Sequence, residues 1–550
     1  MAMYPGLSDV VTSYLAIAVF SLLLLYPLAI VVYNLYFHPL SKFKGPPFWG
    51  ATRLGFINSL IRGNLVRDVR DIHEKYGDVV RLAPDELSFA REDTWHDVYT
   101  KRAGHQQFLK NPVFFKAPPG QPENMVTTLN IENHARMRRL LAPAFTEQAV
   151  MKQEPIVQAH SDLLIRQLKC VVTDQDKSAE KNQDTGAVVD IVRWYNFCTF
   201  DTIGDLGFGE SFDSLKNAEY HPWVALIFNF LKGMELCVSD ICKFADCRGL
   251  CSGMTLAAAT RYYPSLETGL LQFLPAKIKK MQRDHYQVAL DKIHRRMNLE
   301  KERDDFMTPV LKENPNFEKM SLEEIESTFS LLIVAGSETT ATVLSGITNE
   351  LLKAPRELLK LVGEVRSAFQ SQAEITFEAL RTLPFLNAVC QEGFRICNPI
   401  PAGLPRLVPK GGGFVCGHFL PEYTHVTVNP TAIAFSEANF RRAEKFLPDR
   451  FLPQHLRPAE FDGDIRSNQH PFSLGSRSCL GKPLAMAQIG LILAKMVWSF
   501  DIEAVSGRTL DWMTQKTFIV VEKKPVKVRL RMRQDGSIWI IDAAVRTGMS

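Results

Sequence analysis

Apolar positions recur every three or four residues along most of the chain. This spacing dominates residues 147–385, and it predicts amphipathic α-helices that bury one face in a common core. Short runs typical of β-strands gather in two places, residues 79–89 and residues 404–428. The pattern therefore predicts a mainly α-helical body with a small β-rich lobe near its N-terminal end.

One predicted helix has recognisable signals at both ends. Residues 321–352 are helical in pattern, Ser321 and Glu324 form a capping-box start, and Pro355 lies just beyond the end. Gly336 lies inside this helix, where a glycine costs about 1 kcal/mol relative to alanine. A glycine at such a position indicates a local requirement.

The N-terminal segment is apolar. Residues 10–37 contain no charged side chain, and about 20 apolar residues are enough to cross a bilayer. Tyr33 and Tyr36 stand where an interfacial aromatic belt is expected. The alternative is a cleaved signal peptide, which normally has a basic start and a shorter apolar run. We expect one N-terminal transmembrane helix.

The charges that flank this span predict its orientation. Asp9 and no lysine or arginine precede it, whereas Lys42, Lys44 and Arg53 follow it. Because positive charge is retained on the cytosolic side, the body is expected in the cytosol. The expected division of the chain is a lumenal N-terminus at residues 1–9, a transmembrane anchor at 10–37, a Pro-rich hinge at 38–50 and the catalytic domain at 51–550.

Composition argues against two classes of protein. The chain has 64 Lys and Arg against 60 Asp and Glu, and a nucleic-acid partner would require a strong basic bias. The ten cysteines are scattered through a long chain, unlike those of a disulfide scaffold. Four of them fall within fifteen residues without the C-x-x-C pairs of zinc sites, which favours packing or membrane-facing thiols over a metal: Cys237, Cys242, Cys247 and Cys251.

The most informative motif lies near the end of the chain. Residues 472–481 read FSLGSRSCLG and match F-x-x-G-x-R-x-C-x-G at all five fixed positions. Phe472 would keep water from the Cys479 sulfur, and Gly475 and Gly481 permit close backbone approach. Arg477 is a fixed cation suited to a carboxylate group of a cofactor. Cys479 precedes a predicted helix start, where the helix N-terminus favours a thiolate.

A lone cysteine cannot hold an iron–sulfur cluster, but one thiolate on a flat apolar cofactor describes haem ligation. The motif resembles that of the cytochrome P-450 family, in which a cysteine thiolate binds the haem iron. Residues 392–395 match the family's E-x-x-R, and residues 446–451 resemble its P-E-R-F segment with Asp449 in place of the usual glutamate. The resemblance implies that Glu392, Arg395 and Arg450 form a buried structural ion network.

A third motif lies inside the helix predicted at residues 321–352. Residues 335–340 read AGSETT and match the family's A-G-x-[DE]-T-[TS]. The resemblance implies a widened turn at Ala335 and Gly336, where dioxygen fits above the iron. It also implies that Glu338 and Thr339 pass protons to the bound oxygen. Without the resemblance, Gly336 would be a packing site and Glu338 part of a solvated face.

A fourth motif supplies basic side chains. His134 and Arg138 are four residues apart, so both can point from one helical face at a carboxylate. The resemblance implies that they bind the haem propionates together with Arg406 and Arg477. Arg136 and Arg139 face away and fit a basic surface helix or a docking site for a redox partner.

The resemblance extends over nearly all of the chain after the first forty residues and implies a cytochrome P-450 fold. The implied activity is that of a haem-thiolate monooxygenase, with haem b whose iron is ligated by Cys479 and with dioxygen as co-substrate. One oxygen atom would enter an apolar small molecule, and fungal proteins of this type act in secondary metabolism on polyketides, terpenoids or alkaloids. The expected location is the endoplasmic reticulum membrane, as a single-pass protein with a cytosolic catalytic domain.

Too few residues follow Cys479 for a flavin domain, so electrons are expected from NADPH through a separate membrane-bound NADPH-cytochrome reductase. Two alternatives stay open. The same fold could catalyse isomerisation, dehydration, ring coupling or another oxidation without oxygen insertion, although the intact Glu338–Thr339 pair argues against it. The chain could also be a non-catalytic haem-binding membrane protein, against which stands the presence of all four motifs.

Overall fold

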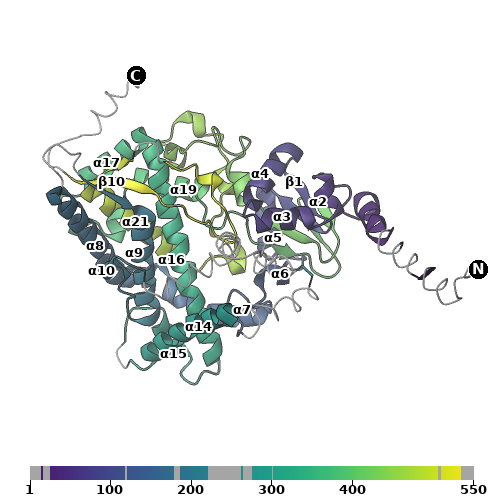
Figure 1. Ribbon diagram of the computed structural model, residues 1–550, viewed down its shortest axis with the longest axis horizontal. Helices are drawn as coiled ribbons and strands as arrows, with labels where there is room; N and C mark the ends of the chain where they lie inside the picture. The colour runs from purple at the N-terminus through teal and green to yellow at the C-terminus, as the bar shows by residue number, and fades with distance from the viewer. Residues whose placement is uncertain are drawn as a thin grey trace, which may run out of the picture.

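The computed structural model describes residues 14–15, 21, 25–117, 121–178, 186–220, 262–263, 276–299, 302–505 and 509–533. Figure 1 shows a helix-rich body crossed by the long helix α16 (Leu322–Lys353). Strand β1 (Val79–Ala83) and the first helices gather at the N-terminal side. The four clustered cysteines, Cys237, Cys242, Cys247 and Cys251, lie outside the described residues.

Helices make up most of the described body, as the apolar periodicity predicts. Besides α16, those before it are α2 (Pro47–Ala51), α3 (Leu54–Ile61), α4 (Leu65–Tyr76), α5 (Glu92–Tyr99), α6 (Pro112–Phe115), α7 (Ile131–Leu141), α8 (Glu147–Ser178), α9 (Ile191–Phe208), α10 (Ser214–Asn217), α14 (Ala276–Met297) and α15 (Met307–Glu313). Those after it are α17 (Pro355–Ala368), α18 (Phe377–Leu380), α19 (Pro384–Ile396), α20 (Pro430–Ala434) and α21 (Lys482–Ser499).

The strands of the described residues form three sheets. The largest joins both predicted strand regions in the order β1-β2-β8-β5-β3, with β2 and β8 parallel and the other neighbours antiparallel. An antiparallel sheet β4-β10-β9 and the hairpin β6-β7 complete them. Their bounds are β2 (Glu86–Phe89), β3 (Leu109–Lys110), β4 (Ala187–Asp190), β5 (Arg406–Leu407), β6 (Gly413–Val415), β7 (His418–Leu420), β8 (His425–Val428), β9 (Phe500–Ala504) and β10 (Lys527–Met532).

Helix α16 begins and ends where the sequence signals place it. The Ser321 side chain accepts a hydrogen bond from the backbone of Glu324 at 3.3 Å, and the Glu324 side chain accepts one from the backbone of Ser321 at 3.0 Å. This reciprocal capping box satisfies two backbone donors that the helix leaves unpaired. The helix ends at Lys353, and Pro355 starts α17, which confirms the prediction.

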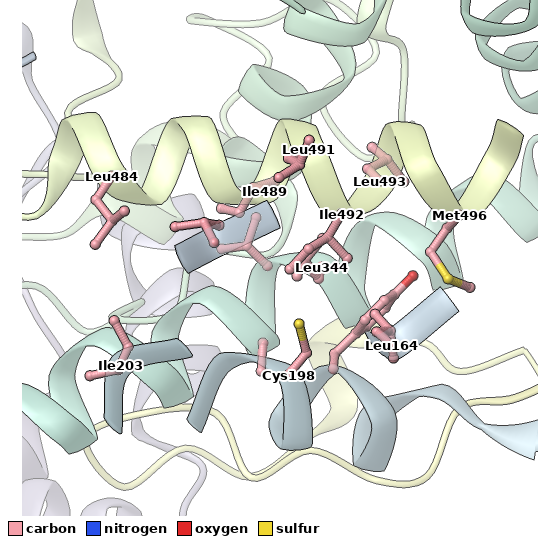
Figure 2. Close-up of a cluster of buried hydrophobic side chains, with 14 of the residues drawn as sticks. Leu164, Cys198, Ile203, Leu344, Leu484, Ile489, Leu491, Ile492, Leu493 and Met496 are labelled. Atoms are coloured by element: carbon pink, nitrogen blue, oxygen red, sulfur yellow. The ribbon is translucent and has the colours of Figure 1, made fainter. Parts of the chain in front are cut away.

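The core surrounds α16. Figure 2 shows Ile489, Ile492 and Met496 of α21 directed toward Leu344 of α16 and Cys198 of α9, and all five side chains belong to one fully buried cluster. Burying a large apolar side chain contributes about 1.5–3 kcal/mol. This packing fixes α16 against the helix that follows Cys479.

The N-terminal segment is a short apolar helix where the structure describes it. Residues Leu25–Phe37 are helical and apolar, and Tyr36 and Phe37 are more than 70% exposed. Among the described residues, only α16 has the length and composition to cross a membrane, and most of it is buried in the body. The predicted span at residues 10–37 therefore stays a prediction.

The segment expected to be a hinge, residues 38–50, makes fixed contacts with the body. The backbone N–H of Arg81 in β1 donates to the carbonyl of Lys44 at 2.8 Å, and the Arg81 guanidinium donates to the carbonyl of Asn34 at 2.8 Å. A side chain on Gly45 would lie 2.3 Å from the Arg81 carbonyl oxygen, so this close approach requires glycine. The end of the apolar helix is thus fastened to β1.

Candidate active site

The loop that carries Cys479 has a backbone path with little freedom. Gly475 has a φ of +74°, and a Cβ there would lie 2.2 Å from the Tyr99 carbonyl oxygen. Ser473 has a φ of +60°, which is uncommon for a residue other than glycine. The backbone N–H of Cys479 donates to the Phe472 carbonyl at 2.9 Å, and the Phe472 ring packs edge-on against Phe394 at 4.9 Å.

Cys479 lies three residues before α21, and its side chain is accessible although the protein packs closely around it. Burial by the surrounding protein raises the pKa of its thiol, while the backbone N–H groups of Gly481 and Lys482 and the Arg138 guanidinium act to lower it. The Arg138 side chain is fixed by a 2.6 Å hydrogen bond to the carbonyl of Ser478. The thiol is thus accessible and already faces donors that favour a thiolate.

Basic side chains from four parts of the chain gather beside this loop. Burial, followed by the cations Lys110, Arg477, Arg138 and Arg406, lowers the pKa of His134 to about 3. Burial and the neighbouring Arg406 lower the pKa of Arg477 to about 10. The structure therefore brings together the four basic residues that the sequence assigns to the haem propionates.

Lys110 is a fifth member of this cluster, and the sequence reasoning missed it. It lies opposite Arg406 in the pairing of β3 with β5, an arrangement of like charges that is destabilising by itself. Its ammonium donates to the carbonyls of Met125, Val126 and Thr128 at 2.7–3.1 Å. Burial, then Arg477 and Arg406, lowers its pKa to about 7.

The chemistry of this cluster fits haem. Both terminal nitrogens of Arg477 are buried and have no hydrogen-bond partner among the described residues. Within that same part of the chain, none of the five basic side chains forms an ion pair with a carboxylate. A buried guanidinium without an acceptor is costly. Two propionate groups would supply the missing acceptors and charge, beside an accessible thiol.

Helix α16 differs from the expectation at Ala335 and Gly336. The widened turn expected there is wrong for this structure, because α16 is continuous α-helix through both residues. The Thr339 hydroxyl donates a hydrogen bond to the Ala335 carbonyl at 2.6 Å. This carbonyl is therefore occupied, whereas a widened turn would leave it free to bind another group. Gly336 has a packing role as well, since a Cβ there would lie 2.8 Å from the Ile203 side chain.

Glu338 and Thr339 lie on different faces of α16. Ala335 is exposed and Thr339 partly exposed, whereas Glu338 is buried and forms an ion pair with Lys523. Lys523 also donates to Thr342 at 3.1 Å. Neighbouring residues of a helix do not face each other, so the structure does not bring the two predicted relay residues together. No motif pointed to Lys523.

Glu392, Arg395 and Arg450 meet in the core, as expected from the motifs. The Arg395 guanidinium binds both oxygens of Glu392, at 2.7 and 2.8 Å, and Arg450 donates to Glu392 at 3.3 Å. Asp464 is a fourth member that the sequence reasoning missed, and it pairs with Arg450. All four side chains are nearly inaccessible, and two carboxylates balance two guanidiniums.

Comparison with known proteins agrees with this geometry. The family model described as Cytochrome P-450 matches residues 44–530. The chain is 36% identical over 516 residues to the cytochrome P-450 monooxygenase lcsI of Purpureocillium lilacinum, with 93% of each chain covered. It is 35% identical to the versicolorin B desaturase stcL of Emericella nidulans, over 92% of this chain and 97% of the relative. It is also 35% identical to the averantin hydroxylase of Dothistroma septosporum, over 93% of this chain and 90% of the relative.

The chain therefore belongs to the cytochrome P-450 family. The expected family, its mainly helical fold with some sheet, and its assignment to the monooxygenase oxidoreductases are confirmed. Membership implies haem-thiolate iron and dioxygen as the reacting groups.

Replacing Asp464 with alanine should destabilise the fold strongly, because it leaves the Arg450 guanidinium buried without its second carboxylate. We expect a loss of about 3–5 kcal/mol in the free energy of unfolding, measured by chemical denaturation followed by circular dichroism. Asp462→Ala is the matched control, since Asp462 is 55% exposed and pairs with Arg457 at the surface. Equal losses in the two variants would contradict a buried network.

His134 predicts a pH dependence of the haem-free protein. Its folded-state pKa of about 3 lies below the ordinary value of 6.5, so protonation favours the unfolded chain and stability is lost as the pH falls from 6.5 toward 3. Between pH 7 and pH 5 this loss is about 1–2 kcal/mol. His134→Asn should lose correspondingly less than the wild type in parallel unfolding curves. An unchanged pH dependence in the variant would show that His134 titrates normally.

Proposed function

We propose that the protein is a haem-thiolate monooxygenase that inserts one atom of dioxygen into an apolar small molecule. The observation that carries this proposal is the buried Arg477 guanidinium without an acceptor, beside the accessible thiol of Cys479. An anionic cofactor that contains a metal would supply acceptors for the Arg477 guanidinium and a ligation site for the Cys479 thiolate. Membership of the family supports the same reading.

The proposed binding site uses residues of four segments. The Cys479 thiolate would hold the haem iron, Phe472, Gly475 and Gly481 would shape its loop, and Ala335 and Gly336 of α16 would line the place where oxygen binds. His134, Arg138, Arg406 and Arg477 would bind the propionates. The bound haem supplies oxygen activation, which electron donation from the thiolate favours.

Proton delivery is the part of the proposed chemistry that side chains perform. The Thr339 hydroxyl lies on the exposed side of α16 and donates to the Ala335 carbonyl, so it can exchange that acceptor for one in the oxygen site. Glu338 is the proposed source of protons and must leave Lys523 to serve that face. Glu392, Arg395 and Arg450 take no part and are proposed to be structural, since they are sealed in the core.

The substrate is proposed to be an apolar intermediate of fungal secondary metabolism. One relative is named as a hydroxylase and another as a desaturase, so a second candidate is an oxidation that ends in a new double bond without oxygen insertion. Oxygen-18 in the product separates the two, since only insertion labels it.

The proposed setting is the cytosolic face of the endoplasmic reticulum membrane. The exposed apolar helix Leu25–Phe37 supports an N-terminal anchor in the bilayer, and its attachment to β1 would keep the body close to the lipid surface. Electrons are proposed to come from NADPH through a separate NADPH-cytochrome reductase.

The carbon monoxide difference spectrum of the reduced protein tests the proposed ligation. We expect the strongly red-shifted Soret band of thiolate-bound haem in the wild type and its loss in Cys479→Ser. Cys397→Ser is the matched control, because Cys397 is fully buried beside Gly346 and should leave the band unchanged. A wild-type band typical of histidine-bound haem would overturn the proposal.

Thr339→Ala should retain haem and the carbon monoxide spectrum but waste reducing equivalents. Because general acid catalysis contributes about 10²–10⁴-fold, we expect most of the NADPH consumed by this variant to appear as hydrogen peroxide. Thr340→Ala controls for the loss of a hydroxyl, since the Thr340 hydroxyl bonds to the Gly336 carbonyl at 2.9 Å and is buried. Unchanged coupling in Thr339→Ala would remove Thr339 from the mechanism.

A further inference from the structure

Lys110 differs from the other side chains of the basic cluster because its donors are already occupied. It is 5% exposed, and its ammonium donates to the carbonyls of Met125, Val126 and Thr128 at 3.1, 2.7 and 3.0 Å. An ammonium has three N–H donors, so one short segment of the chain takes all of them. By contrast, both terminal nitrogens of Arg477 have no partner among the described residues.

The segment that the ammonium binds is a closed turn, residues 124–128, which we call the Asn124 turn. The side-chain oxygen of Asn124 accepts from the backbone N–H groups of Val126 and Thr127 at 3.0 and 2.9 Å. The backbone N–H of Thr128 donates to the Asn124 carbonyl at 2.9 Å. Three N–H groups of the turn thus bond to Asn124 and three of its carbonyls bond to the ammonium, so loss of the ammonium would leave those carbonyls without their donor.

The Asn124 turn is attached to two helices of the proposed site. The Asn124 amide donates to the Ser327 hydroxyl of α16 at 3.2 Å, and Ser327 lies about two helical turns before Ala335. Just after the Asn124 turn, the Asn130 side chain caps the start of α7, the helix that carries His134. The turn therefore bridges the proposed oxygen-binding helix and the helix of the basic cluster.

The position of Lys110 is unfavourable for its charged form. Burial, then the like charges of Arg477 and Arg406, lowers the pKa of Lys110 to about 7, while Glu123 acts to raise it. A neutral amine has one N–H donor fewer than an ammonium, so it cannot hold all three carbonyls of the Asn124 turn. Negative charge bound by the basic cluster would favour the ammonium. Anion binding and ordering of the turn therefore favour each other.

We propose that Lys110 is a positioning residue that couples binding of the anionic cofactor to the order of the Asn124 turn. With the charge of the basic cluster neutralised, the ammonium holds the three carbonyls and fixes the turn between α16 and α7. Because coupling between two sites is reciprocal, the ordered turn slows release of the cofactor. The inference rests on the proposed function, in which that cofactor is haem.

Hydrogen exchange of the full-length protein, with and without haem and followed by mass spectrometry, gives the first readout. In the wild type, haem should slow exchange of the backbone amides of residues 126–128 about fivefold or more. Lys110→Met should exchange these amides fast in both states, because the donor of the three carbonyls is gone. Direct cover by haem would instead protect the wild type and Lys110→Met equally, and that result would overturn the coupling.

Transfer of haem to excess apomyoglobin gives the second readout, the rate of haem release. Asn124→Ala keeps the Lys110 charge but loses the contacts that close the turn, and it serves if Lys110→Met fails to fold. Each single variant should release haem about fivefold or more faster than the wild type. The double variant Asn124→Ala/Lys110→Met should release it no faster than the faster single one, because residues that act as one unit are not additive. Release at the wild-type rate from Asn124→Ala, or additive effects, would show that Lys110 acts by charge alone and would overturn the coupling.

Asn314→Ala and Lys495→Met are the matched controls and should release haem at the wild-type rate. Asn314 is 2% exposed and likewise closes a turn, where its side chain accepts from the backbone N–H of Lys319 at 2.8 Å. Lys495 is 1% exposed and pairs with Asp162 of α8. Equally fast release from the controls would mean a general loss of stability and would overturn the role of Lys110. A wild type that binds no haem would overturn the proposed function, whereas one that binds haem without slower exchange in the Asn124 turn would overturn the coupling alone.

Discussion

A cluster of buried basic side chains lies beside the Cys479 loop. Burial and four nearby cations, Lys110, Arg477, Arg138 and Arg406, lower the pKa of His134. In the described part of the chain none of these cations forms an ion pair with a carboxylate, although Glu123 acts electrostatically on Lys110. Burial and mutual repulsion both oppose such an arrangement. Two of these side chains are held by backbone carbonyls, Arg138 by that of Ser478 and Lys110 by three others. The fold therefore carries an excess of positive charge that an anionic cofactor would neutralise, and cofactor binding and stability are coupled.

The buried network around Glu392 differs from the basic cluster because its positive and negative charges balance within the protein. There, two guanidiniums meet two carboxylates, and the backbone carbonyls of Ala443 and Lys445 accept further hydrogen bonds from Arg395 at 2.7 and 2.9 Å. Nothing from outside is needed to complete it. Balanced buried charge fixes the loop path before Cys479, whereas unbalanced buried charge beside that cysteine leaves a place for a ligand. The difference in charge balance separates the buried network around Glu392 from the cluster proposed to bind the cofactor.

Local sequence signals predicted what depends on local spacing. The capping box of Ser321 and Glu324 set the start of α16, and the three-residue spacing of Glu392 and Arg395 predicted their pairing. Asp464, Lys110 and Lys523 were missed because their contacts arise from tertiary packing: Lys523 and Glu338 are 185 residues apart. The prediction of a widened turn at Ala335 was wrong because a motif shows only which residues are present and not their backbone conformation. In the structure the helix is regular, and the Thr339 hydroxyl donates to the Ala335 carbonyl within it.

Hydroxyl groups bond back to the helix along the whole middle of α16. Thr339, Thr340, Thr342 and Thr348 each donate to the carbonyl four residues earlier, at 2.6–2.9 Å. Such bonds slightly weaken and bend a helix. At Thr339 the bond also occupies the hydroxyl hydrogen that proton transfer would require. Thr339 is engaged by Ala335, and Glu338 by Lys523. Both residues proposed for proton transfer must therefore give up a partner before they can act.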